Sequence, residues 1–125
     1  MTRNEKIARR MKWEIYSATF GCPMIQLDNK ECFRLDNLGQ NTPAGLWLAK
    51  LLQAKMVADD KLMICIWQIS DKLFSAEAFT RTKRKDGQSF IAEVDADTEP
   101  AALHALFCKV YGITEPASIA GGITV

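Results

Sequence analysis

The densest cluster of positive charge in the 125-residue chain lies in a predicted turn. Arg81, Lys83, Arg84 and Lys85 come directly before the turn sequence Asp86-Gly87. Such a cluster could contact the phosphates of a nucleic acid or an acidic protein surface. No aromatic residue lies within the loop to stack on bases, so sequence-specific reading of single strands is not expected. A solvated hairpin tip kept soluble by Lys and Arg explains the same residues, and we favour that interpretation.

Four carboxylates follow at every second position, at Glu93, Asp95, Asp97 and Glu99. On a strand this spacing places side chains on one face, where carboxylates could bind a hard cation. A solvent-exposed strand that leads into a helix with an acidic first turn accounts for the run more simply. The run could also pair with a basic surface on a neighbouring subunit.

No residue pattern indicates an enzyme. His104 is the only histidine, and a general base needs a nucleophile and an orienting acid beside it. The chain has no C-x-x-C pair to supply metal ligands and no glycine-rich phosphate loop. We therefore expect no catalytic residues, no metal, no cofactor and no small-molecule ligand.

Composition and charge exclude several further classes of protein. With 16 Lys and Arg against 15 Asp and Glu, the net charge of +1 excludes a generally basic binder of polyanions. No apolar run approaches the roughly 18 residues that a membrane span needs, and the charged N-terminus lacks an export signal. The cysteines are widely spaced, and Cys65 and Cys108 lie in apolar runs, so we expect reduced, buried thiols. These features predict a protein of the bacterial cytoplasm without membrane contact.

Aromatic residues supply a different kind of candidate site. Trp13, Tyr16 and Phe20 lie in a segment with weak secondary-structure signals, and if exposed they would form a patch that needs a partner. Trp47 and Trp67 lie in strongly patterned segments, so we expect both in the core.

Three helices are predicted from capping signals and apolar spacing. Thr2 and Glu5 have the spacing of a capping box, which predicts a helix over 3–11. Asn41-Thr42-Pro43 opens a longer helix to about residue 57, and Thr98-Glu99-Pro100 opens the last helix. Gly112 suits a left-handed residue just beyond the end of that last helix.

Between these helices, strand-like segments are expected at 61–70, 73–82 and 88–95. Their connections are short, so neighbouring strands should pair as an antiparallel meander. The first of them is apolar on both faces, which favours a central position or cover from a second layer. A short hairpin around 28–30 is also expected in the N-terminal half.

Taken in order, these elements resemble the phage ABA sandwich family of small proteins from tailed bacteriophages and prophages. The resemblance covers about residues 4–113 and depends on three stretches: Glu5-Lys6-Ile7-Ala8 with the residues to Trp13, Asn41-Thr42-Pro43, and Asp97-Thr98-Glu99-Pro100-Ala101-Ala102-Leu103 with the end at Tyr111-Gly112-Ile113. Segment 16–33 and the glycine-bearing tail depart from the family. The resemblance implies a phage or prophage origin and a helix–sheet–helix arrangement, and it implies no activity.

The sequence therefore predicts one α+β domain over 1–113 and a loosely ordered tail over 114–125. Its centre is a three-stranded antiparallel meander, with or without an extra N-terminal hairpin, packed by two amphipathic helices as an α-β-α sandwich. The expected function is protein–protein interaction without chemistry, through a host or viral partner or self-association. The alternative is nucleic-acid or nucleoprotein binding through residues 81–85.

Overall fold

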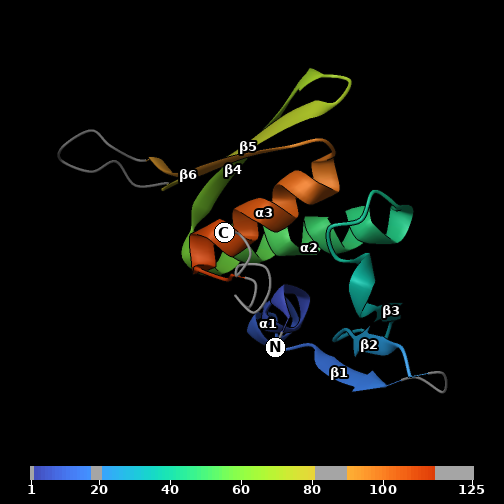
Figure 1. The fold of residues 1–125 in the computed structure, drawn as a ribbon. Helices are drawn as coiled ribbons and strands as arrows, with labels where there is room; N and C mark the ends of the chain where they lie inside the picture. Colours follow the sequence, from blue (N-terminus) through green and yellow to red (C-terminus); the bar gives the residue numbers. More distant parts are fainter. Residues whose placement is uncertain (1, 18–20, 81–89, 115–125) are drawn as a thin grey trace, which may run out of the picture.

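The computed structural model describes residues 2–17, 21–80 and 90–114, and it confirms the α+β fold class (Figure 1). The elements in chain order are α1 (Arg3–Arg10), β1 (Glu14–Ser17), β2 (Pro23–Gln26), β3 (Cys32–Arg34), the short 3-10 helix η1 (Leu35–Asn37), α2 (Pro43–Asp60), β4 (Leu62–Ser70), β5 (Leu73–Thr80), β6 (Phe90–Ala96) and α3 (Glu99–Tyr111). The predicted tail lies outside the described residues, apart from Thr114.

Capping residues begin and end the helices as their types predict. The Thr2 hydroxyl accepts a hydrogen bond from the Glu5 backbone N–H, and the Glu5 carboxylate accepts one from the Thr2 backbone N–H, which completes the capping box of α1. Thr42 and Thr98 cap α2 and α3, each followed by a proline in the first turn. Gly112 ends α3 in the left-handed conformation, with a φ of 67°.

The strands form two separate antiparallel sheets. The predicted meander is confirmed as β4-β5-β6, with β5 in the centre. The predicted N-terminal hairpin is β2 and β3, and β1 adds a third strand that the sequence did not reveal. The β4 strand is therefore an edge strand, so the first of the two alternatives, a central position, is wrong. Helix α2 covers one of its faces.

The layers are arranged around the two long helices (Figure 1). Helices α2 and α3 lie side by side on one face of the β4-β5-β6 sheet, and α1 with the β1-β2-β3 sheet lies on the far side of them. One hydrophobic cluster joins all three layers, with Ile7, Leu48, Met56 and Phe107 fully buried in it. Within the described residues, no helix is both long enough and apolar enough to cross a membrane.

Strand register assigns each residue of the larger sheet to one of its two faces. The face against α2 and α3 carries the rows Ile64-Ala78-Ala92 and Ile66-Ala76-Val94. The alanines in these rows are almost completely buried. Small side chains there let the helices approach the sheet closely. Because both long helices lie on this inner face, the opposite face of the sheet is the open one.

Candidate functional site

The open face of the larger sheet combines exposed apolar side chains with carboxylates. Three rows of paired residues form it, and we call this set the exposed sheet face: Met63-Phe79-Phe90, Cys65-Glu77-Glu93 and Trp67-Ser75-Asp95. Within this set Ser75, on the central strand, is buried. None of the described helices packs against this face.

Large apolar side chains on this face are exposed to solvent. Met63, Trp67 and Phe90 are 49%, 47% and 55% exposed. Phe79 and Phe90 stack edge to face, with ring centroids 5.8 Å apart. The expectation that Trp67 lies in the core is thus wrong, because its strand has cover on one face only. Contiguous apolar patches of this kind mark interaction surfaces on folded proteins.

Three carboxylates share the same face. Glu77 lies directly opposite Glu93 in the strand pairing, and Asp95 lies one row away. Like charges on directly opposed strand residues are destabilising. Burial raises the pKa of the Glu77 carboxyl, and the negative charges of Glu93 and Asp95 raise it further. The sequence showed Glu93 and Asp95, but only strand register reveals that Glu77 joins them.

The acidic run predicted at 93–99 is divided by the end of β6. Only Glu93 and Asp95 belong to the exposed sheet face. Glu99 lies in the first turn of α3, where its carboxylate accepts a hydrogen bond from the Lys50 ammonium at 2.5 Å. Within the described ranges, no three His, Cys, Asp or Glu side chains are arranged to hold a metal ion.

His104 joins elements rather than facing open solvent. Its Nε2 lies 2.7 Å from Oδ1 of Asn4, which links α3 to α1. The Asn4 amide nitrogen donates to the carbonyl oxygens of Leu35 and Leu38, at 3.3 and 3.5 Å. Gly39 packs against the imidazole, because a Cβ there would lie 3.0 Å from Cδ2 of His104. These contacts give the histidine a structural role in the described molecule.

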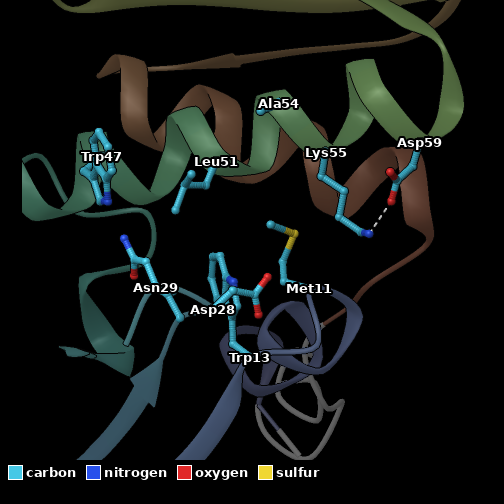
Figure 2. Close-up of a pocket in the computed structure, with 10 residues that line it drawn as sticks. Met11, Trp13, Asp28, Asn29, Trp47, Leu51, Ala54, Lys55 and Asp59 are labelled. Carbon is cyan, nitrogen blue, oxygen red and sulfur yellow. Dashed lines mark hydrogen bonds and ion pairs between the residues drawn. The ribbon is translucent and has the colours of Figure 1, made fainter. Parts of the chain in front are cut away.

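A second feature is a pocket of about 430 Å³ between α2 and the α1–β1 connection (Figure 2). Trp13 and Met11 line it from one side, and Trp47 and Leu51 line it from α2. At its far end the Lys55 ammonium donates to the Asp59 carboxylate, which lowers the pKa of that carboxyl. Nothing in the sequence revealed this pocket, because its walls come from distant segments.

The tryptophans of this pocket reverse the expected order of burial. Trp13, expected in an exposed patch, is only 7% exposed, whereas Trp47, expected in the core, is 48% exposed. Burial of Trp13 corrects the predicted patch, in which Tyr16 is 38% exposed on β1. Phe20 lies outside the described residues.

Two sets of predicted residues have different outcomes. Arg81, Lys83, Arg84 and Lys85 all lie outside the described residues, so their proposed contact with nucleic acid stays a prediction. The described structure has the cysteines as free thiols, and the expectation that they are buried is wrong for Cys32. Cys108 is buried, Cys22 and Cys65 are partly buried, and Cys32 is exposed.

Comparison with known proteins identifies no relative. No family model matches the chain, no curated protein matches it, and no solved structure matches its fold. Any functional site therefore has to be identified from the geometry of this molecule.

Proposed function

We propose that the protein is a non-enzymatic protein-interaction module whose docking surface is the exposed sheet face. The partner is a protein segment that combines apolar side chains with Lys or Arg. The observation that carries this proposal is the exposure of Met63, Trp67 and Phe90 beside three carboxylates on one open sheet. Trp is enriched at binding hot spots, and Met packs adaptably against varied partners.

Charge determines which kind of partner fits. Within the described part of the chain, no basic side chain is ion-paired with Glu77, Glu93 or Asp95. Lys109 reaches this region, but its ammonium donates to the backbone carbonyl of Glu93 at 3.0 Å. An apolar partner without basic groups would bury these carboxylates unpaired, which costs free energy. A partner carrying Lys or Arg offsets that cost and relieves the repulsion between the carboxylates.

Selection of binding peptides tests the proposed chemistry of the partner directly. A display library of random linear peptides is selected on the immobilised protein and sequenced. We expect enrichment of peptides that combine aromatic or aliphatic residues with Lys or Arg. Binding should fall at least about ten-fold with Trp67→Gln and should weaken with rising salt.

A matched variant controls for the loss of an exposed indole elsewhere. Trp47 is as exposed as Trp67 but lies on α2, away from the exposed sheet face. Trp47→Gln should leave binding of the selected peptides unchanged. Enrichment of acidic peptides, or equal binding to wild type and Trp67→Gln, would contradict the proposal.

The origin of the partner is a separate part of the proposal. The sequence resemblance to the phage ABA sandwich family supports a viral or bacterial host protein as the partner. A peptide enriched in the selection supplies a sequence pattern to compare with both sources.

A further inference from the structure

The outer edge of β4 is unprotected against pairing with another strand. Leu62–Ser70 contains nine residues, and none of them is charged or a proline. Most natural edge strands carry charges, prolines or bulges that prevent pairing with other chains. The register shift between β4 and β5 lies only at the end of β4. The opposite edge, β6, has more protection, because it carries Glu93 and Asp95 and a register shift near Phe90.

Charged residues border this uncharged strand in a symmetric order. Asp60-Lys61 comes directly before it and Asp71-Lys72 directly after it, and all four residues are exposed. In an antiparallel pair of two β4 strands centred on Ile66, Lys61 lies beside Asp71 of the second copy. Asp60 is the last residue of α2, and its carboxylate accepts a hydrogen bond from the Tyr111 hydroxyl, so it takes no part in this pairing. A parallel pair in register would instead bring like charges together.

We propose that two copies of the chain pair through β4 about a twofold axis at Ile66. The two larger sheets then join into one continuous antiparallel sheet. The contact is made by the backbone edge of β4 and borders the exposed sheet face, to which β4 contributes Met63, Cys65 and Trp67. It does not depend on the peptide partner proposed for that face. An isologous contact of this kind closes after two copies, because the same edge is used on both sides.

The same register brings apolar side chains together on the outer side of the strand. Met63 lies opposite Ile69 of the second copy, and Cys65 lies opposite Trp67. Ile69 is 61% exposed in the single chain, so pairing would remove apolar surface from water.

The paired edge has room for a second chain. A hollow of about 310 Å³ lies between the inner side of β4 and α2, lined by Ile64, Ile66 and Gln68 from the strand. The β4–β5 hairpin also projects beyond the helices in Figure 1, and Asp71 and Lys72 at its turn are exposed. The described helices therefore leave the edge accessible.

Two charge reversals test both the dimer and its register. Lys61→Asp and Asp71→Lys are suitable because neither side chain is hydrogen-bonded or ion-paired to a described residue. Position 61 has a φ of 58°, which Asp tolerates. Sedimentation velocity should find the wild type dimeric at micromolar concentration. Each variant alone should dimerise roughly ten-fold more weakly, because like charges then meet at both ends of the pair.

An equal mixture of the two variants is the decisive measurement. In a mixed pair, positions 61 and 71 again carry opposite charges at both ends, so the mixture should dimerise as strongly as the wild type. Restoration on mixing also shows that each variant is folded. A monomeric wild type, or variants whose weakening is not restored on mixing, would overturn the proposal. Peptide binding at the exposed sheet face would be unaffected by that outcome, so the two proposals fail separately.

Discussion

The two faces of the β4-β5-β6 sheet come from the same strands but have opposite surroundings. Ala78 on the inner face is fully buried beneath the helices, whereas Glu77, its neighbour in sequence, lies on the outer face among two other carboxylates. The inner face has small side chains that fit a covering layer. The outer face carries exposed Trp67 and Met63 with no described layer over them.

Because only the inner face is covered by helices, we expect the two faces of the sheet to have different roles, the inner face in folding and the outer face in partner binding. Packing on α2 and α3 requires the inner face, so substitutions there should act on the free energy of unfolding. The outer face contributes little to the described core, so substitutions there should act chiefly on partner binding. Substitution of matched residues on the two faces tests this division.

The largest effect is expected from overpacking the inner face. Ala78→Leu inserts a branched side chain where the strand meets the helix layer, and we expect the free energy of unfolding to fall by about 1–3 kcal/mol. Urea denaturation followed by circular dichroism measures the change. Cys65→Leu, on the outer face, is the control and should change stability much less. Equal losses in both variants would show that the outer face is also covered.

A smaller effect on stability is expected from the exposed indole. Trp67→Gln removes cross-strand contacts on a half-exposed surface, so the free energy of unfolding should fall by less than about 1 kcal/mol. The same urea titration measures it, beside the peptide-binding assay. A loss as large as that of Ala78→Leu would place Trp67 in the folding core and contradict the division of the two faces.

The smallest effect concerns the pH dependence of stability. Burial and the charges of Glu93 and Asp95 raise the pKa of Glu77 in the folded state. The folded state therefore binds its proton more tightly than the unfolded state does. Stability should decline as pH rises from the ordinary glutamate pKa to the raised one, and then stay level with respect to this group.

Glu77→Gln removes this contribution. The variant should be more stable than the wild type at neutral pH, and the difference should disappear below the ordinary glutamate pKa. Urea denaturation at a series of pH values measures both. Glu31→Gln, at an exposed turn, is the control and should not reproduce the gain. A wild type that is more stable than Glu77→Gln at neutral pH would contradict repulsion among the three carboxylates.

Local signals predicted most of the described fold because they act within a few residues. The capping box at Thr2 and the Thr-Pro starts of α2 and α3 satisfy backbone N–H groups near them in sequence, whatever packs around them. The short connections between β4, β5 and β6 likewise require antiparallel neighbours. Strand β1 was missed because its four residues have no strong local pattern.

The candidate site was predicted much less completely. Periodicity places Trp67 on one face of its strand, but it does not say whether that face is covered. Glu77 is distant from Glu93 in the sequence, so their approach depends on strand register. Trp13 is buried because segments distant in sequence pack around it.

The sequence by itself determined where the helices and the meander begin and which residues alternate along each strand. It also carries the uncharged run Leu62–Ser70 and the opposite charges on either side of it. Tertiary structure alone decided that β4 is an edge strand and that the face bearing Trp67 and Glu77 is open. The physical reason is that burial is a property of long-range packing, whereas capping, turns and alternation depend on neighbouring residues.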